Sequence, residues 1–288
     1  MTLFRNAKLV LPSGVLPNGW LLASDGRIAE LGGADVQPTR LSDVVDLGGA
    51  YLAPGFVDMH VHGGGGASFT TGDPQDALRT VEFHRLHGTT TTIASTVTAA
   101  LPDLERQISE LAGLVEDGVL AGVHLEGPFL SKVRCGAHDP SLLRPPELPV
   151  LAKLTAAGRG TVRMVTLAPE LAGGLDSVEW LADQGIIAAI GHTDADADQT
   201  RAALDRGAAV ATHLFNAMRS LHHREPSAAN ALLDDSEAML LSQAGIDSDE
   251  DADCVVEMGG RGVANAPHMV TETAIRGFYQ HYRAVMGL

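Results

Sequence analysis

The sequence predicts an α/β fold, an incomplete (β/α)8-type barrel preceded by a small β-sandwich portion. Two patterns lead to this prediction. From Tyr51 onward, short apolar or β-branched runs alternate with helical segments, as in parallel strands covered by helices. Before Tyr51, short runs are separated by Gly and Pro turns, which favours a small β unit. A chain of 288 residues, 45% of them hydrophobic, can bury a sizeable core.

The expected elements follow the chain in two blocks. Residues 1–52 are assigned to the β unit, with strands at Leu3–Leu11, Gly19–Ser24, Arg27–Leu31 and Asp43–Leu47. Residues 53–235 are assigned to the barrel. Its expected strands are the apolar run Tyr51–Val57, then Thr89–Thr96, Gly118–Leu125, Thr161–Leu167, Ile186–Ile190 and Ala208–His213. Its expected helices are Pro74–His87, Pro102–Glu116, Leu148–Ala157, Leu175–Gln184 and Ala195–Arg206. These units outnumber those of a four- or five-stranded open sheet, which favours a barrel.

Residues 236–288 are expected to form an atypical acidic and helical tail. After about Asp235 the strand and helix rhythm fails and does not resume clearly enough to supply two more units. Cys254–Met258 is expected to be a short strand, and Thr271–Met286 a helix with one apolar face. The acidic residues before Cys254 are expected to form a solvated loop, because the spacing of an EF-hand is absent.

The composition excludes several classes of function. A formal net charge of −16 argues against nucleic-acid binding. Two cysteines do not make a disulfide framework. The N-terminus lacks the apolar segment of a signal peptide, and no run is long enough to span a bilayer. We therefore expect a cytoplasmic protein that binds neither nucleic acid nor membranes.

Five residues at predicted strand ends have the chemistry of metal ligands. His60 and His62 are one residue apart at the end of an apolar run, so their side chains point the same way. Glu126, His192 and His213 each lie at the end of a later run, and the carboxyl ends of barrel strands form the rim on which active sites are built. A lone His-x-His is as often a surface pair, but ligand-type residues at four strand ends predict a metal centre.

Imidazole and carboxylate ligands without a thiolate suit Zn²⁺, with Fe²⁺, Mn²⁺ or Co²⁺ as substitutes. We expect one or two ions, bridged by Glu126 if there are two. Of the other histidines, His84 and His87 are expected to face outward from a helix. His124 shares a strand face with Glu126 and is a candidate for support of the ligands.

The motifs around these residues resemble one family in detail. They are Pro-Gly-Phe-Val-Asp-Met-His-Val-His-Gly at 54–63, His-Leu-Glu-Gly-Pro-Phe at 124–129, Gly-His-Thr at 191–193, Thr-His-Leu-Phe-Asn-Ala-Met at 212–218 and His-His-Arg-Glu-Pro at 222–226. From the N-terminus to about Asp235 the chain resembles N-acetylglucosamine-6-phosphate deacetylase, of the amidohydrolase superfamily of metal-dependent barrel hydrolases. The resemblance implies that Glu126, His192 and His213 hold a catalytic metal and that His60 and His62 hold a second one.

The same resemblance implies a substrate and a reaction. Ala137 and His138 match the sugar-contacting loop of the family, Asn216 and Ala217 match further substrate contacts, and Arg224 matches a phosphate ligand reached across a dimer interface. The implied reaction is hydrolysis of N-acetylglucosamine 6-phosphate to glucosamine 6-phosphate and acetate, by attack of metal-bound hydroxide on the amide. A homodimer and a small amino-sugar phosphate are the implied partners.

The chain departs from the family after about Asp235. The family carries a general-base aspartate in a Thr-Asp-Ala setting and an Asp-Gly-x-His segment, and neither is found here. Asp234, Asp235 and Asp247 are carboxylates in another context, so the catalytic base stays unassigned. One alternative is therefore a catalytically impaired remnant that binds metal and sugar phosphate. Another is an amidohydrolase acting on a cyclic amide, against which the missing carboxylated-lysine motif weighs.

Overall fold

A computed structural model describes residues 1–36, 43–235 and 238–240 of the chain. The chain divides into two compact units, Met1–Phe56 and Val57–Leu288. The expected strand Cys254–Met258, the expected helix Thr271–Met286 and Asp247 lie outside the described residues. Within the described ranges, every helix is too short or too polar to span a membrane.

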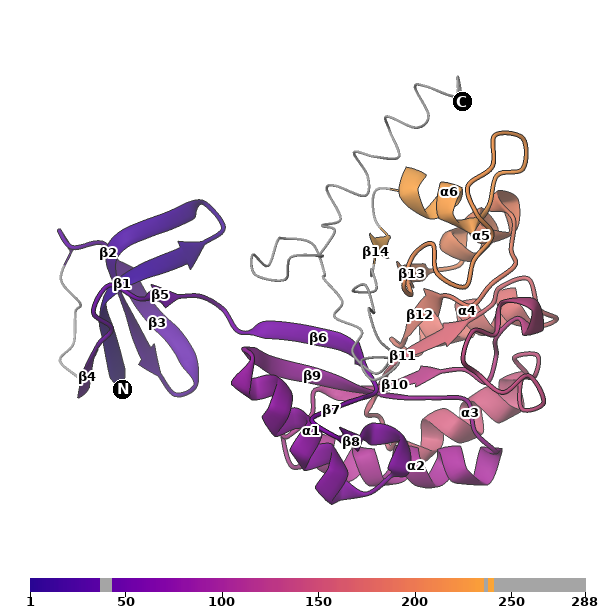
Figure 1. The fold of residues 1–288 in the computed structure, drawn as a ribbon, viewed down its shortest axis with the longest axis horizontal. Helices are drawn as coiled ribbons and strands as arrows, with labels where there is room; N and C mark the ends of the chain where they lie inside the picture. The colour runs from indigo at the N-terminus through magenta and orange to yellow at the C-terminus, as the bar shows by residue number, and fades with distance from the viewer. Residues whose placement is uncertain (37–42, 236–237, 241–288) are drawn as a thin grey trace. The chain divides into compact units, whose positions relative to one another are not determined.

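The first unit is a β-sheet. Its strands are β1 (Thr2–Leu11), β2 (Gly14–Ser24), β3 (Arg27–Gly32), β4 (Asp43–Asp46) and β5 (Tyr51–Leu52). Along the sheet the order is β3-β2-β1-β4, and β5 also pairs with β1 (Figure 1). Asp25 and Gly26 join β2 to β3 with φ angles of 52° and 72°, as the two central residues of a tight hairpin turn require. Trp20 and Leu22 are buried in this unit.

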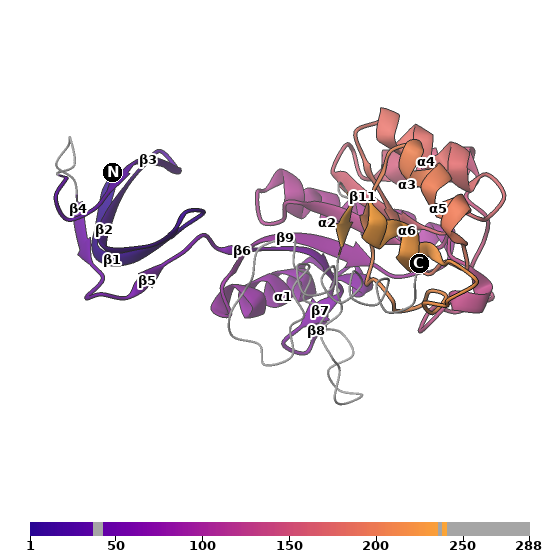
Figure 2. The same ribbon diagram turned by 90° about the horizontal axis from the view of Figure 1, so that it is seen from above.

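The second unit is built on a seven-stranded sheet with the order β14-β13-β12-β11-β10-β9-β6. The strands are β6 (Phe56–Val61), β9 (Thr89–Thr96), β10 (Gly122–Glu126), β11 (Val162–Leu167), β12 (Ile187–Ile190), β13 (Ala208–Ala211) and β14 (Met239–Leu240). Spatial order follows chain order, and the pairs from β9 to β14 are all parallel. The sheet curls as half of a barrel, which confirms the predicted α/β class (Figures 1 and 2).

Helices line the convex side of this sheet (Figure 1). They are α1 (Pro74–Leu86), α2 (Leu101–Glu116), α3 (Leu148–Ala157), α4 (Gly174–Asp183), α5 (Ala197–Asp205) and α6 (Ala228–Asp234). The amphipathic face of α2 buries Leu104, Ile108 and Leu111, in one core with Val123 and Leu125 of β10. Apolar side chains on a helical period thus set the helices against strands that are buried on both faces.

Polar side chains define where several helices begin. The Asp73 carboxylate accepts a hydrogen bond from the backbone N–H of Gln75 before α1, and proline occupies the first helical position. At α5, Asp196 and Gln199 form a reciprocal capping box. Helix α6 begins with a similar pair, Ser227 and Asn230.

The structure differs from the sequence-based expectations in several elements. The run Tyr51–Val57 was expected to be one barrel strand, but Tyr51–Leu52 forms β5 and pairs with β1, and the strand of the second sheet, β6, begins at Phe56. Helix α6 was not among the expected helices. Strand β14 continues the strand and helix rhythm beyond about Asp235, where it was expected to fail, and pairs in parallel with β13. A two-residue strand is too short to leave a periodic signal. The small hairpin of β7 (Gly63–Gly64) and β8 (Ala67–Ser68) was also not expected.

His84 was expected to face outward, and this expectation is wrong. The side chain is buried, and its Nε2 lies 2.9 Å from the backbone oxygen of Gly63. The reason is the unexpected hairpin, because β7 and β8 cover the face of α1 that carries His84. His87, at the end of the same helix, is exposed as expected.

Candidate metal centre

Five ligand-type side chains come from four strand ends of the half-barrel. His60 belongs to β6, and His62 follows that strand directly. Glu126 is the last residue of β10, and His192 lies two residues beyond β12. His213 lies two residues beyond β13. In a parallel sheet these ends share one rim, so the topology brings together residues far apart in the sequence.

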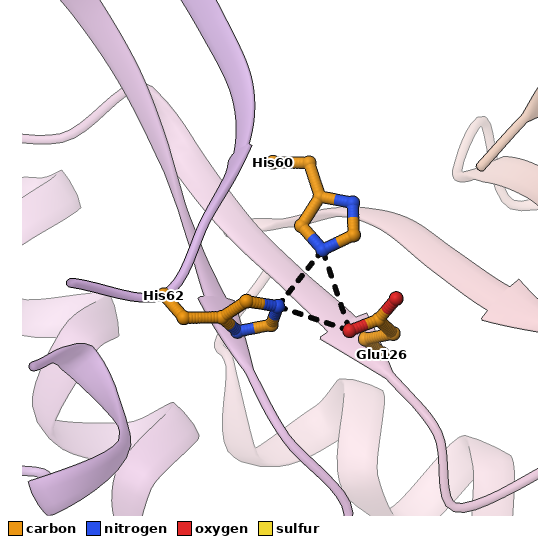
Figure 3. A group of neighbouring side chains, drawn as sticks. All are labelled: His60, His62 and Glu126. Carbon is orange, nitrogen blue, oxygen red and sulfur yellow. Dashed lines mark hydrogen bonds and ion pairs between the residues drawn. The ribbon is translucent and has the colours of Figure 1, made fainter. Parts of the chain in front are cut away.

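The five residues form two groups that share Glu126 (Figure 3 shows the first). In the first group, Nε2 of His60 lies 2.9 Å from Nε2 of His62, and these atoms lie 3.3 and 3.0 Å from Oε2 of Glu126. In the second group, Nε2 of His192 lies 2.9 Å from Nε2 of His213. Those two atoms lie 3.2 and 3.1 Å from Oε1 of Glu126. One carboxylate therefore offers a different oxygen to each pair of imidazoles.

The hydrogen bonds on the far side of three imidazoles decide where their protons lie. Each Nδ1 faces a backbone carbonyl oxygen, namely that of Ser95 for His62 at 3.3 Å, Arg134 for His192 at 2.9 Å and Asn216 for His213 at 3.3 Å. A carbonyl oxygen only accepts, so each Nδ1 carries the proton and donates. In the neutral imidazole, Nε2 then presents a lone pair to the Glu126 carboxylate, which is itself an acceptor.

Lone pairs that face one another in a buried site need a cation between them. Glu126, His192 and His213 are all buried, which removes water as the alternative partner. Burial alone would raise the pKa of Glu126, but the charge of His60, followed by the hydrogen bond from His138, holds that pKa well below its usual range. A divalent metal ion in each group fits the same donors, so the residues present fit a metal centre.

His124 is buried next to His60, one of the candidate ligands. Its Nδ1 lies 2.8 Å from Oγ of Ser95 and its Nε2 lies 2.8 Å from Oγ1 of Thr166. Its ring packs edge-on against that of His60, with centroids 4.7 Å apart. Burial, followed by the charge of His60, lowers the pKa of His124 well below its ordinary value. His124 is therefore a neutral ring that contacts a candidate ligand, in the supporting place that the sequence suggested.

Of the expected substrate residues, His138 lies beside the cluster. It is buried, its Nε2 lies 3.5 Å from Oε2 of Glu126, and its ring packs edge-on against His192. Its Nδ1 accepts a hydrogen bond from the backbone N–H of Thr98 at 3.4 Å and lies 2.8 Å from the hydroxyl of the same residue. The neutral ring therefore carries its proton on Nε2, the atom that faces the cluster.

The other expected substrate residues lie on loops at the rim. Ala137 is exposed on the loop after β10, next to His138. Asn216 is exposed, and its backbone oxygen accepts from His213 as described above. The carbonyl of Ala217 accepts a hydrogen bond from the backbone N–H of Thr193 at 3.1 Å. Arg224 is exposed on the loop between β13 and α6.

Backbone strain is concentrated at this rim. His192, His213 and Ala217 have φ angles of 47°, 30° and 49°, in the left-handed region that residues with a Cβ rarely adopt. Conformations of this kind persist where surrounding contacts hold them, and they gather at functional sites. Two candidate ligands are thus set in place by their surroundings.

A polar network beside His192 was not expected from the sequence. The carboxylate of Asp194 accepts from Nε of Arg134 at 2.9 Å and from Nη2 of Arg219 at 2.7 Å. The hydrogen bond from Arg219, with that from Arg134, lowers the pKa of Asp194 despite its partial burial. These partners lie on separate loops without periodic patterns. The only sequence signal was an aspartate two residues after a candidate ligand.

No second carboxylate joins the cluster within residues 1–36, 43–235 and 238–240, since Glu126 is the only acidic member of both groups. Asp234 lies 4.0 Å from Arg201, and Asp235 accepts from the backbone N–H of Ala238 at 2.8 Å. Neither belongs to the His/Glu groups, and Asp247 lies outside the described residues.

The sequence and the fold match those of known proteins. The model of the amidohydrolase family matches residues 51–279. The chain is 36% identical to an N-acetylgalactosamine-6-phosphate deacetylase of Escherichia coli O157:H7, over 77% of this chain and 60% of the relative. It is 33% identical to an N-acetylglucosamine-6-phosphate deacetylase of Lysinibacillus sphaericus, over 80% of this chain and 60% of the relative.

A solved structure shares the fold. The N-acetyl-D-glucosamine-6-phosphate deacetylase of Mycobacterium smegmatis is 46% identical, with a TM-score of 0.80 over 85% of this chain and 64% of that chain. The chain thus spans about 60% of the length of the curated relatives it matches.

Proposed function

The chain belongs to the amidohydrolase family, and we propose that it is a metal-dependent hydrolase that deacetylates N-acetylglucosamine 6-phosphate to glucosamine 6-phosphate and acetate. The observation that carries this proposal is the position of Glu126, which is buried and offers one oxygen to each of two imidazole pairs. The donor set suits Zn²⁺, with Fe²⁺, Mn²⁺ or Co²⁺ as substitutes. His60 and His62 would hold one ion, His192 and His213 the other, and Glu126 would bridge them.

Amide hydrolysis near neutral pH needs an activated water and a polarised carbonyl. When bound, a divalent metal ion lowers the pKa of a coordinated water to about 7 and polarises the acetyl oxygen. The chain supplies the rest. Glu126 balances the metal charge, and the Nδ1 hydrogen bonds of His62, His192 and His213 keep their Nε2 atoms free to coordinate.

His138 is proposed to donate a hydrogen bond to the substrate. The proton on its Nε2 faces the cluster, which suits an acetyl oxygen that gains negative charge in the transition state, or a sugar hydroxyl. Burial strengthens such a bond because water does not compete for the donor.

The phosphate is proposed to bind Arg224, whose planar guanidinium pairs well with phosphate oxygens. Ala137, Asn216 and Ala217 are proposed to contact the sugar, since they lie on the two loops that carry His138 and His213. We propose a homodimer in which Arg224 serves the site of the partner subunit. We also propose a cytoplasmic location and no binding to nucleic acid or membranes, consistent with the net charge of −16.

Two observations leave alternatives to the proposed substrate and to the proposed turnover, and an experiment can separate them. A relative named for N-acetylgalactosamine 6-phosphate matches at an identity similar to that of relatives named for the glucosamine epimer. In addition, Glu126 is the only carboxylate of the two candidate groups among the described residues, and this favours a protein that binds metal and sugar phosphate but turns over slowly.

The test is acetate release by the purified full chain after loading with Zn²⁺. N-acetylglucosamine 6-phosphate, its galactosamine epimer and unphosphorylated N-acetylglucosamine are supplied in parallel, with His192→Ala as the control for metal dependence. We expect release from the glucosamine phosphate that falls with His192→Ala and is weaker without the phosphate. Preference for the epimer would reassign the substrate. Tight binding of the sugar phosphate without acetate release would support the impaired remnant.

A further inference from the structure

We propose that Asp194 is a positioning residue of the metal centre, which acts on His192 by fixing the backbone of Arg134. The inference rests on the metal binding proposed above. Asp194 itself contacts Arg134, Arg219 and Glu170 and is not one of the candidate metal ligands or expected substrate residues. It predicts that metal affinity depends on an ion-pair cluster outside the ligand set.

The centre of the cluster is the Asp194 carboxylate. Its two oxygens are shared between two arginines, Oδ1 with Nε of Arg134 at 2.9 Å and Oδ2 with Nη2 of Arg219 at 2.7 Å. Arg134 ends the short helix Lys132–Arg134 in the loop after β10, and Arg219 lies in the loop after β13. One carboxylate therefore joins loops 60 and 25 residues away in the sequence.

Arg134 is held at both ends. Its guanidinium is fixed by Asp194, and its backbone oxygen accepts the Nδ1 proton of His192 at 2.9 Å. The backbone oxygen of His192 in turn accepts from the N–H of Ser131 at 2.9 Å, in the same loop. The backbone carbonyl of Arg134 orients the His192 ring, and Asp194 positions that carbonyl by holding the Arg134 side chain. A displaced Arg134 would release both the tautomer and the ring angle of a candidate ligand.

The same residues tie down the loop that carries His213. Thr193 donates its backbone N–H to the carbonyl of Ala217 at 3.1 Å, and Thr193 and Met218 form a parallel bridge beside Arg219. A third loop joins from β11, where the Glu170 carboxylate accepts from the Thr193 hydroxyl at 2.6 Å and from the Asp194 N–H at 2.7 Å. Four rim loops therefore meet at residues 193 and 194.

The exposure of the cluster separates positioning from stability. The side chains of Asp194, Arg134 and Arg219 are 27%, 35% and 42% exposed, and ion pairs of this exposure add little to the free energy of folding. His192, which they orient, is buried. Loss of the pairs should therefore leave the fold nearly as stable but loosen a metal ligand.

The experiment measures Co²⁺ binding to the full-length, metal-free protein by its visible absorption spectrum, which reports ligand geometry, and by the dissociation constant. The variants are Asp194→Asn, Arg134→Met and the double variant. The Asn amide keeps the size of the carboxylate but turns a donor toward one guanidinium, whereas Met keeps the aliphatic stem of Arg134 and its backbone oxygen. The matched control is Asp196→Asn, which removes the same charge two residues away in the sequence. Asn also serves well as a helix N-cap in place of Asp196.

We expect each single variant to weaken Co²⁺ binding by about 10- to 100-fold, the usual effect of losing a group that orients a metal ligand. The spectrum should change, the melting temperature of the metal-free protein should stay close to wild type, and the control should behave as wild type. The double variant should lose no more than the weaker-binding single variant, because both changes break one connection. Wild-type Co²⁺ binding by Asp194→Asn, an equal loss in Asp196→Asn, or additive losses in the double variant would overturn the proposal.

The outcome is distinguishable from failure of the proposed deacetylase activity. If wild type binds Co²⁺ and the variants bind it more weakly, the positioning role stands whether or not acetate is released. If wild type releases acetate and Asp194→Asn binds Co²⁺ normally, the activity stands and the positioning role is wrong.

Discussion

Replacement of Glu126 by Gln should weaken the stabilisation of the protein by metal and should not destabilise the metal-free protein. Oε1 of Glu126 faces His192 and His213, and Oε2 faces His60 and His62, so one substitution removes the negative charge from both groups. Loss of an outer group that orients a ligand already costs 10- to 100-fold in affinity, so loss of the shared ligand should cost at least about 100-fold. That factor corresponds to about 2.7 kcal/mol per ion.

The magnitude follows from linkage between binding and folding. At a free metal concentration 1,000 times the dissociation constant, one bound ion stabilises the wild-type protein by about 4.1 kcal/mol. At the same concentration a variant that binds 100-fold more weakly gains only about 1.4 kcal/mol. At about 2–4 °C per kcal/mol, these values correspond to rises in melting temperature of roughly 8–16 °C and 3–6 °C.

The metal-free variant should change in the opposite direction. The Gln amide places two N–H donors where the carboxylate had only acceptors, and the Nε2 lone pairs of the surrounding imidazoles can accept them. Removal of a buried charge also ends its desolvation cost. We therefore expect metal-free Glu126→Gln to melt at or above the temperature of metal-free wild type.

The assay is thermal unfolding with and without Zn²⁺, beside Glu147→Gln as a control in which an exposed carboxylate outside the cluster is neutralised. A full metal-induced shift in Glu126→Gln, or no shift in wild type, would refute the argument from facing lone pairs. Destabilisation of metal-free Glu126→Gln but not of metal-free Glu147→Gln would assign Glu126 to the fold instead.

Three further outcomes are expected. Arg224→Ala should weaken binding of the 6-phosphate sugar by about tenfold to a hundredfold and leave the unphosphorylated sugar unaffected, as measured by calorimetry, because a charge-assisted contact contributes about 1.5–3 kcal/mol. His138→Ala should lower kcat for acetate release by about 10²- to 10³-fold while elemental analysis finds unchanged metal, since a hydrogen-bond donor to the reacting oxygen is lost; reduced metal content would make it a ligand instead. Leu125→Ala should lower the free energy of unfolding by about 2–5 kcal/mol in urea titration, because the side chain is fully buried between sheet and helices; a loss below 1 kcal/mol would contradict that packing.

The sequence predicted the elements that carry a long periodic signal. Thr89–Thr96 and Leu148–Ala157 have the expected bounds, because one is a β-branched run and the other an apolar helix with proline in its first turn. Helix α6 and strand β14 were missed because seven and two residues do not span enough periods. His84 was misplaced because its burial depends on a hairpin of glycines with no strand-like pattern.

The candidate site also has features that the sequence predicts and features that it does not. The convergence of His60, Glu126 and His213 was predictable because each follows an apolar run, and parallel strands present such ends on one rim. The contacts of Asp194 were not predictable, because its arginine partners lie on irregular loops whose approach depends on the folded backbone. The roles of the expected substrate residues remain predictions.

The curvature of the sheet has a consequence for the metal centre. His60 lies on β6 and His213 follows β13, five neighbouring strands apart in the order of the sheet. In a flat sheet, strands spaced about 4.8 Å apart would separate them by about 24 Å. Their ring centroids lie 6.0 Å apart. Two metal ions that share Glu126 as a ligand would therefore connect the two ends of the curved sheet. A substitution that reduces the curvature of the sheet, even one far from the ligands, should therefore lower the affinity for metal before it unfolds the protein.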